Sequence, residues 1–404
     1  MRARVFIASL MSIGLATAGA KAADADDGIK IGVLTDLSGT YSDLSGAGSV
    51  WAAKQAAADY LKDHPGLKIE VVQADHQNKP DIAANTARQW FDTDGVDVIV
   101  DLVTSSTALA VVNIAKEKNK VALVSGAGSS ALTGKSCTPN SIHWAYDTYA
   151  LATGTGSAIV KSGGDSWFFL TADYAFGQAL ESDTSAVVVK NGGKVLGSAK
   201  HPFPSQDFSS FLLQAQASKA KVIGLANAGA DTTNAIKQAS EFGIVQGGQR
   251  LAGLLVFLSD VNALGLKTAQ GLTFTESWYW DQTDANRAFA KAFSAANNGK
   301  YPTMVHAGVY SSLIHYLKAV EALKSDVDGA AIVAKMKELP TDDPLFGKGS
   351  VRADGRKIHD MYLFEVKKPE ESKGPYDYYK QLAVIPAAEA WRPVDQGGCP
   401  MVAK

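Results

Sequence analysis

Short apolar runs alternate with amphipathic stretches in the first part of the chain. The apolar runs are rich in β-branched residues and predict strands, whereas the stretches between them have helical periodicity. Strands buried on both faces and separated by helices are typical of a parallel sheet with helices on either side. The predicted strands are Ile29–Thr35, Leu67–Ala74, Val96–Val103 and Lys120–Ser125, and the predicted helices are Val50–Lys62, Ile82–Thr93 and Ala108–Glu117.

The same alternation begins again near Ser166, so we predict an α/β fold of two doubly wound, Rossmann-like lobes. The later strands and a long helical region need a sheet to join, which indicates that the chain crosses between the lobes more than once. The second series has strands Ser166–Thr171, Lys194–Ala199, Val222–Ala226 and Leu251–Phe257 and helices Ala179–Asn191, Phe208–Ser218 and Thr232–Glu241; the late elements are Leu272–Thr275, the helical region Ala288–Leu323, Met361–Val366 and Tyr379–Ile385.

The first 22 residues follow the pattern of a cleaved signal peptide. Arg2 and Arg4 precede the apolar stretch Val5–Leu15. A small-x-small cleavage signal follows at Ala20-Lys21-Ala22. This leader predicts an exported, soluble protein that begins near Ala23.

Composition and motif content exclude several classes of function. A chain of 404 residues, 46% hydrophobic and 20% charged, can form two domains with separate cores. Its net charge of -2 gives no electrostatic basis for binding nucleic acid or an anionic membrane surface. The histidines lack metal-ligand spacing and no nucleophile elbow is present, so we expect no metal, no cofactor and no enzymatic activity.

The chain has only two cysteines, Cys137 and Cys399. Neither lies in a CxxC motif or beside histidines, which argues against a redox or metal role. Since the leader directs the chain to an oxidising compartment, we predict one disulfide between them.

Hydroxyl-bearing and small residues gather in three loops that follow predicted strands of the first lobe. In open parallel sheets, ligands bind beyond the carboxyl ends of the strands. Hydroxyls and free backbone N–H groups at a helix start can together bind an anion such as a carboxylate, although Ser and Thr there also serve simply as helix caps. The loops are Ser38–Asp43, Thr104–Thr107 and Ser125–Ser130.

Five further motifs occur in one order along the chain: IKIGVLTDLSG, AAADYL, VDVIVDLVTSSTALAV, VALVSGAGSSALTG and ADYAFGQAL. Together with the leader they resemble the periplasmic solute-binding proteins of the Leu/Ile/Val family, which serve ATP-binding-cassette (ABC) importers. The resemblance covers essentially the whole mature chain. It implies a type I periplasmic binding fold, in which three hinge segments join two lobes and the ligand is clamped between them. On this basis, lobe 1 is expected to comprise residues 28–145 and 277–357, and lobe 2 residues 146–276 and 358–404.

For the first lobe, the resemblance assigns the ligand carboxylate to the hydroxyl of Ser105 or Ser106, helped by backbone N–H groups at the start of their helix. Gly126, Ala127 and Gly128 stand where family members offer a backbone carbonyl and a Thr hydroxyl. Glycine occupies the Thr-like position here, so the expected contacts are backbone groups. Capping remains the alternative role for both serines.

The second lobe departs from the pattern of amino-acid binders. Phe176 stands where family members often have Tyr, and the loop around Asn227 has no aromatic residue. Asp260 is the nearest counterpart of the acid that would hold a ligand ammonium, and only with a shift in register. Tyr41, Phe176 and the cluster Trp278-Tyr279-Trp280 could instead form an aromatic slot, although core packing is the alternative for that cluster.

The resemblance therefore implies a periplasmic protein, not an enzyme, that clamps a small carboxylate and delivers it to the membrane permease of an ABC importer. We expect a monomer whose ligand is an amino acid or an aromatic acid. A carboxylate with a planar or aromatic body should bind at least as well as leucine, because a buried, unpaired ammonium is costly. The alternatives are a periplasmic sensor domain for the same kind of ligand and a dedicated binder of branched-chain amino acids.

Overall fold

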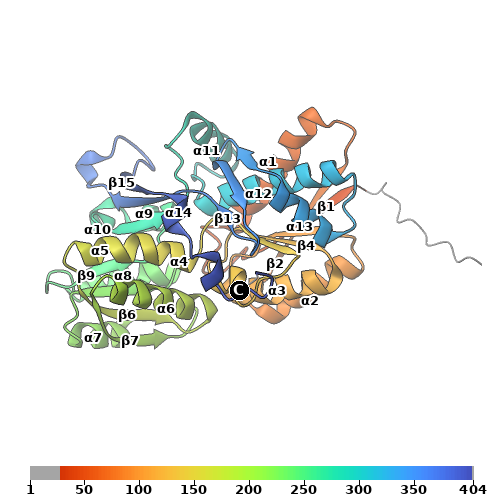
Figure 1. The fold of residues 1–404 in the computed structure, drawn as a ribbon. Helices are drawn as coiled ribbons and strands as arrows, with labels where there is room; N and C mark the ends of the chain where they lie inside the picture. The colour runs from red at the N-terminus through yellow and green to blue at the C-terminus, as the bar shows by residue number, and fades with distance from the viewer. Residues whose placement is uncertain (1–27, 403–404) are drawn as a thin grey trace, which may run out of the picture.

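The computed structural model describes residues 28–402, which form two lobes lying side by side (Figure 1). The predicted signal peptide, residues 1–22, lies outside the described residues. The first lobe is built on a five-stranded parallel sheet in the order β2-β1-β3-β4-β5. Its strands are β1 (Ile29–Thr35), β2 (Ile69–Asp75), β3 (Val98–Asp101), β4 (Val121–Val124) and β5 (Ser141–His143).

The second lobe contains a four-stranded parallel sheet in the order β7-β6-β8-β9 and a three-stranded antiparallel sheet in the order β10-β14-β15. The two doubly wound lobes predicted from the apolar runs are thus confirmed. The strands are β6 (Ser166–Ala172), β7 (Lys194–His201), β8 (Val222–Ala226), β9 (Arg250–Gly253), β10 (Thr273–Glu276), β14 (Met361–Val366) and β15 (Tyr379–Ile385); β11 (Thr341–Asp343), β12 (Gly347–Val351) and β13 (Lys357–Ile358) form a small separate sheet.

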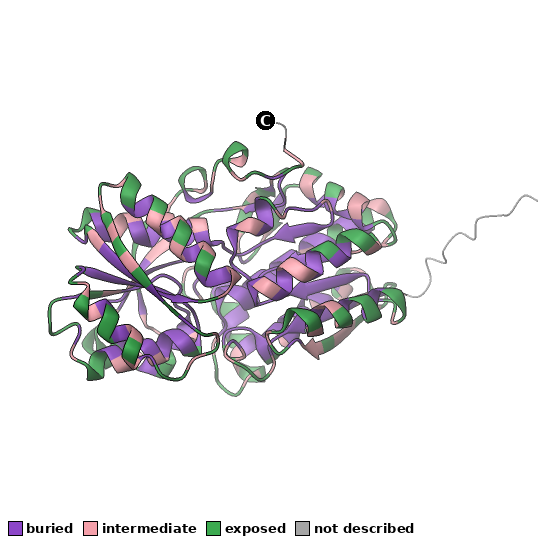
Figure 2. Cartoon of the chain, turned by 90° about the horizontal axis from the view of Figure 1, so that it is seen from below, coloured by how far each residue is buried: buried purple, intermediate pink, exposed green. Residues whose placement is uncertain are grey.

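Helices cover both faces of the first sheet because neighbouring strand residues point to opposite faces. Val98 and Val100 join the core under α1, α12 and α13, whereas Ile99 joins the core under α2 and α3. Figure 2 shows these buried strands between helices whose outer faces are exposed. The first-lobe helices are α1 (Gly46–Asp63), α2 (Pro80–Asp92), α3 (Ser105–Lys118), α11 (Asp284–Ala296), α12 (Met304–Leu323) and α13 (Gly329–Glu338), with a 3-10 turn at Ser130–Thr133.

Two predicted elements differ from the structure. The strand predicted over Leu251–Phe257 ends at Gly253, and the residues after it form an irregular loop. The long helical region is split into α11 and α12, because Asn298 and Gly299 take positive φ angles and Pro302 follows them. The remaining helices are α4 (Thr148–Leu151), a π-helix (Ala152–Gly156), α5 (Ser157–Lys161), α6 (Ala175–Lys190), α7 (Ser209–Ala217), α8 (Ala230–Glu241), α9 (Leu258–Leu264), α10 (Leu266–Ala269) and α14 (Ala387–Ala390), with 3-10 turns at Pro369–Glu371 and Val394–Gln396.

The chain passes between the lobes three times: after β5, after β10, and between β13 and β14. After β15 the tail returns to the first lobe, where Cys399 forms a disulfide with Cys137 across 262 residues of sequence. The predicted disulfide is therefore present. The lobe boundaries implied by the resemblance stay a prediction. Within residues 28–402, no helix is both long enough and apolar enough to cross a membrane.

Candidate functional site

A small cavity lies between the two lobes, where the loops after the parallel strands meet. Its volume is about 10 Å³, close to what one water molecule needs, so a larger ligand requires the lobes to move apart. None of the residues that line it carries a charge at neutral pH, and most present carbon to the cavity. The lining residues are Tyr41, Leu44, Val103, Gly128, Tyr146, Tyr174, Phe176, Ala228, Leu255 and Phe257.

The first-lobe wall of the cavity includes residues from the loops after β3 and β4, which are neighbouring strands, and from the loops after β1 and β5. Ser105 is buried, and its Oγ accepts a hydrogen bond from the Ser129 N–H at 3.1 Å, which ties the two loops together. No acceptor within residues 28–402 takes the hydroxyl proton of Ser105, so this group is able to donate to a ligand. Ser106 is partly exposed.

The loop after β4 offers hydrogen-bond donors rather than acceptors. Its carbonyls are occupied: the Tyr146 hydroxyl donates to the Gly126 oxygen, and His143 Nε2 lies 2.6 Å from the Ala127 oxygen. By contrast, the N–H groups of Ala127 and Gly128 donate no hydrogen bond to any residue that the structure describes. Free amides beside the start of a helix as long as α3 suit an anion such as a carboxylate.

Two glycines allow this loop to lie so close to its neighbours. A Cβ at Gly128 would lie 2.8 Å from Tyr146 Cε2 and 2.9 Å from Phe176 Cε2. A Cβ at Gly126 would lie 2.6 Å from Val103 Cα, inside any normal contact distance. A larger residue at position 128 would therefore displace rings that form the cavity wall.

In the second lobe, Phe176 is buried and lines the cavity, but Asn227 does not. The Asn227 side chain turns away to bond His201 Nε2 at 3.1 Å and the Thr232 hydroxyl at 2.7 Å. Ala228, the next residue, takes the place in the cavity wall. The structure therefore brings Phe176 to the cavity and leaves the polar atoms of Asn227 in a separate network.

Asp260 also lies outside the cavity wall. It sits in the first turn of α9, where its Oδ2 accepts a hydrogen bond from the Phe257 N–H at 2.9 Å. Phe257, not Asp260, lines the cavity. Burial raises the pKa of Asp260 to about 7 and that of Glu276 well above its usual value. No acid is thus among the lining residues.

Tyr41 and Tyr174 meet across the cavity from opposite lobes. Their hydroxyl oxygens are 2.6 Å apart, and both rings stack on Phe203, with centroids 5.2 and 4.4 Å away. Sequence reasoning selected Tyr41 but missed Tyr174 and Tyr146. The available signal was position, because Tyr174 lies two residues after β6 and directly before α6, where a parallel sheet places its ligand-facing residues.

The cluster Trp278-Tyr279-Trp280 packs elsewhere. Trp278 contacts Phe289 edge-on, and Tyr279 stacks on Tyr379 with centroids 4.6 Å apart. Trp280 Nε1 donates to the Tyr376 carbonyl at 2.9 Å. None of the three lines the cavity, so core packing accounts for the cluster.

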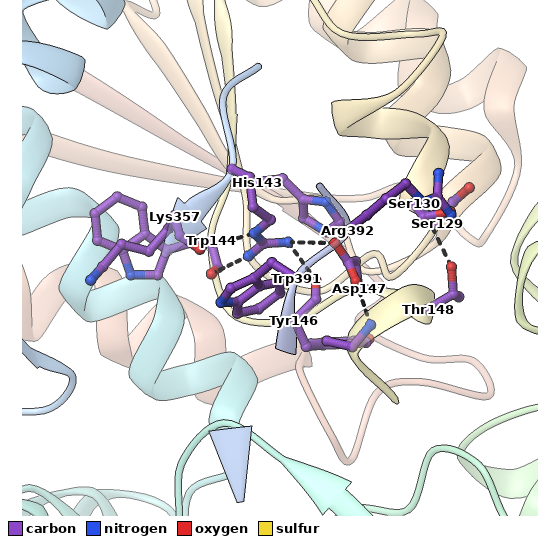
Figure 3. Close-up of polar contacts among 12 residues, drawn as sticks. Ser129, Ser130, His143, Trp144, Tyr146, Asp147, Thr148, Lys357, Trp391 and Arg392 are labelled. Atoms are coloured by element: carbon purple, nitrogen blue, oxygen red, sulfur yellow. Dashed lines mark hydrogen bonds and ion pairs between the residues drawn. The ribbon is translucent and has the colours of Figure 1, made fainter. Parts of the chain in front are cut away.

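Beside the hinge, a buried arginine joins the crossing segments (Figure 3). Arg356 is fully buried and donates to the carbonyls of Trp144, Tyr146 and Lys357. Its guanidinium lies 3.6 Å from the Asp147 carboxylate and 4.3 Å from the centre of the Trp391 ring. We call Arg356 and these partners the hinge cluster.

A second polar contact joins the lobes next to the hinge cluster, and three of its residues, Ser130, Thr148 and Arg392, are labelled in Figure 3. Asp183 on α6 accepts hydrogen bonds from Ser130 at 2.8 Å and Thr148 at 2.7 Å. It also forms an ion pair with Arg392 in the C-terminal tail. We call Ser130, Asp183 and Arg392 the latch. Within residues 28–402, no group of three His, Cys, Asp or Glu residues could hold a metal ion.

Comparison with known proteins identifies relatives along almost the whole chain. A family model described as periplasmic binding protein matches residues 28–375. The solved structure of a periplasmic binding protein from Burkholderia mallei is 53% identical, with a TM-score of 0.90 over 93% of this chain and 99% of that one. A branched chain amino acid ABC transporter periplasmic ligand-binding protein from Burkholderia xenovorans LB400 is 39% identical, with a TM-score of 0.80 over 92% and 99% of the two chains.

More distant relatives carry two kinds of name. The Leu/Ile/Val-binding protein homolog 6 of Brucella melitensis is 26% identical over 387 residues, or 93% of this chain and 95% of that protein. An ABC transporter solute binding protein from R. palustris, solved in complex with benzoate, shares the fold with a TM-score of 0.78 at 23% identity, over 92% and 99% of the chains. The family and these relatives are binding proteins of ABC transporters, not enzymes. The chain therefore belongs to the periplasmic binding protein family.

Proposed function

We propose that this protein is the monomeric solute-binding component of an ABC importer and that its ligand is a small aromatic carboxylate. The observation that carries this proposal is the chemistry of the cavity. Gly128 lines the cavity with a free N–H group, and the free Ala127 N–H and the Ser105 hydroxyl belong to the same two loops of the first lobe. The rest of the lining is aromatic or aliphatic and uncharged. Such a cavity suits an anionic head on an apolar, planar body.

An aliphatic amino acid would be a poorer ligand. Its ammonium needs a buried acid or several acceptors, and an unpaired buried charge is strongly unfavourable. Phe257 occupies the wall near the position expected for that acid, and the Asp260 carboxylate is engaged by the Phe257 N–H. The benzoate complex of the R. palustris protein supports an aromatic acid, whereas the name of the Burkholderia xenovorans protein favours the alternative of a branched-chain amino acid.

Binding would act through closure of the lobes. A ligand shifts the population toward the closed form only if it binds that form better than the open one. In this account, Ser105, Ala127 and Gly128 hold the carboxylate on the first lobe while Phe176 and Phe257 pack on the ring from the second. The closed form then docks on the permease. The leader at residues 1–22 supports export to the periplasm.

A thermal-shift screen tests the proposal. Benzoate, leucine and the neutral analogue benzamide are added to the mature protein, and a ligand that binds the folded state raises Tm. We expect benzoate to raise Tm and benzamide to leave it unchanged, because the free N–H donors select an anion. Equal shifts with benzoate and benzamide would contradict a carboxylate site.

A matched pair of glycine variants tests whether the ligand binds in this cavity. In Gly128→Ala the new methyl group collides with Tyr146 and Phe176, so the benzoate shift should disappear. Gly374→Ala serves as the control, because no atom lies within 4 Å of its added Cβ. If Gly128→Ala keeps the full shift, the ligand binds elsewhere.

A further inference from the structure

Few of the side chains that line the cavity can form hydrogen bonds. Of its lining residues, only Tyr41, Tyr146 and Tyr174 carry polar side-chain atoms. Tyr146 uses its hydroxyl proton to donate to the Gly126 carbonyl. Any side-chain hydrogen bond to a ligand at this cavity wall must therefore come mainly from Tyr41 and Tyr174.

The hydroxyls of Tyr41 and Tyr174 do not use all their hydrogen-bonding capacity. Each can donate one hydrogen bond and accept others, and the pair shares a single bond of 2.6 Å. Neither hydroxyl bonds any other residue among positions 28–402. One of the two O–H protons thus has no acceptor among the described residues, and it lies at a cavity lined mainly by apolar and aromatic residues. An unused donor in such surroundings costs free energy unless a ligand satisfies it.

The tyrosine pair and the carboxylate donors lie at different points along the edge of the first sheet. Tyr41 belongs to the loop after β1, and Ala127 and Gly128 belong to the loop after β4. Strand β3 lies between β1 and β4, so the two loops leave the sheet roughly 10 Å apart. A benzene ring with a polar group at each end has dimensions suited to this separation.

We propose that the Tyr41–Tyr174 pair is a specificity-determining subsite that binds a ring hydroxyl at the end of the ligand opposite its carboxylate. This inference rests on the proposed function and narrows the ligand class to hydroxylated aromatic acids. A hydroxyl both accepts from the unused tyrosine proton and donates to a tyrosine oxygen. An ammonium could only donate, which would leave that proton unsatisfied.

A second carboxylate is also disfavoured at this subsite. Asp231, in the first turn of α8, is buried, and its Oδ2 has no hydrogen-bond partner among the described residues. Burial is the main cause that raises the pKa of both tyrosines, and Asp231 adds to it. Burial also raises the pKa of Asp231 itself to about 7. Above about pH 7, where Asp231 is ionised, a second negative group there would be repelled, whereas a neutral hydroxyl would not.

Calorimetry on the mature protein tests the subsite with benzoate, 4-hydroxybenzoate and 4-(aminomethyl)benzoate. We expect wild type to bind 4-hydroxybenzoate at least tenfold more tightly than benzoate, because a site built to bond a hydroxyl discriminates strongly against its absence. In Tyr174→Phe and in Tyr41→Phe, each shown by its Tm to be folded, this ratio should fall to within about threefold while benzoate still binds. Tyr362→Phe, a tyrosine outside the cavity wall, should keep the wild-type ratio.

Each other outcome contradicts the inference in a distinguishable way. Equal affinity for benzoate and 4-hydroxybenzoate, or a ratio that survives both phenylalanine variants, would overturn the subsite and leave the proposed function intact. Tightest binding by 4-(aminomethyl)benzoate would show that the pair, with Asp231, recognises an ammonium. Failure of every aromatic carboxylate to bind wild type would overturn the proposed function and the subsite together.

Discussion

The cavity and the hinge cluster both lie between the two lobes, but they differ in how far their hydrogen-bonding groups are paired. In the hinge cluster, the Arg356 guanidinium donates to three carbonyls and lies against the Asp147 carboxylate. Beside the cavity, the N–H groups of Ala127 and Gly128 have no partner among residues 28–402. Buried polar groups are ordinarily satisfied, so free donors at the edge of a cavity are available to a ligand. The hydrogen-bonding groups of the hinge cluster are therefore paired with one another, whereas the donors beside the cavity remain available for a ligand.

The largest expected effect comes from breaking the hinge cluster. Arg356→Ala leaves the buried Asp147 carboxylate without its partner and three carbonyls without donors, so the free energy of unfolding should fall by about 3–5 kcal/mol. Urea denaturation measures this. Arg287→Ala is the control, because its ion pairs with Asp281 and Asp284 are exposed and should be worth at most about 1 kcal/mol. An equal decrease in the free energy of unfolding in the two variants would show that the hinge cluster stabilises the fold no more than an exposed ion pair does.

The next largest expected effect is a dependence of stability on pH that comes from Asp260, which lies outside the cavity wall. Burial raises the pKa of Asp260 to about 7, so between about pH 4 and pH 7 the folded state binds more protons than the unfolded state. Stability from this group is therefore present at low pH and lost as the pH rises to about 7. The difference in the free energy of unfolding between Asp260→Asn and wild type should favour the variant more at pH 8 than at pH 4.5. Urea denaturation of both proteins at the two pH values measures this difference.

Asp342→Asn, at an exposed aspartate that is not among the causes of the Asp260 shift, is the control for this pH effect and should change stability equally at both pH values. Glu276 has a pKa raised in the same direction by burial, so some of the wild-type pH slope will remain in Asp260→Asn. An Asn variant that is destabilised equally at pH 4.5 and pH 8 would contradict the raised pKa of Asp260.

In the cavity, a small deletion should affect binding more than folding. Ser105→Ala removes a donor to the ligand carboxylate, so affinity for an aromatic carboxylate should fall by about 2 kcal/mol, with a smaller change in the free energy of unfolding. Calorimetry on wild type and variant provides the comparison. Ser106→Ala, at a partly exposed position, should have the weaker effect. Unchanged affinity in both variants would mean that the serines have a structural role only, such as the Ser105 bond to the Ser129 N–H.

The latch should produce the smallest effect. Asp183→Asn removes the charge that pairs with Arg392 but keeps an oxygen for Ser130 or Thr148. The partly buried ion pair should contribute about 1 kcal/mol to closure, so ligand affinity should fall several-fold. Asp173→Asn, whose carboxylate is exposed on the same lobe, should leave affinity unchanged. Equal titration curves for both variants would show that the latch does not favour the closed form.

The sequence predicted the sheets well because they depend on local patterns. The runs Val222–Ala226 and Met361–Val366 match β8 and β14 residue for residue. The edge of the first sheet was predictable for the same reason, since loops after neighbouring parallel strands must meet.

The second-lobe wall was harder to predict, because the chain is irregular there. Once β9 ends at Gly253, no periodicity tells which residue faces the cavity, and Phe257 lines it while Asp260 caps α9. Tyr174 was missed because its partner, Tyr41, lies 133 residues away in the other lobe. Contacts of this kind depend on how the lobes close and have no local signature.

The central claim is that the cavity binds a carboxylate without binding an ammonium, and competition calorimetry with benzoate and leucine tests it most directly. We predict micromolar binding of benzoate-type acids and at least tenfold weaker binding of leucine, because no charged residue lines the cavity beside Phe257. Micromolar binding of leucine, isoleucine and valine, with no binding of benzoate, would contradict the account. That result would show that an ammonium site exists in the second lobe.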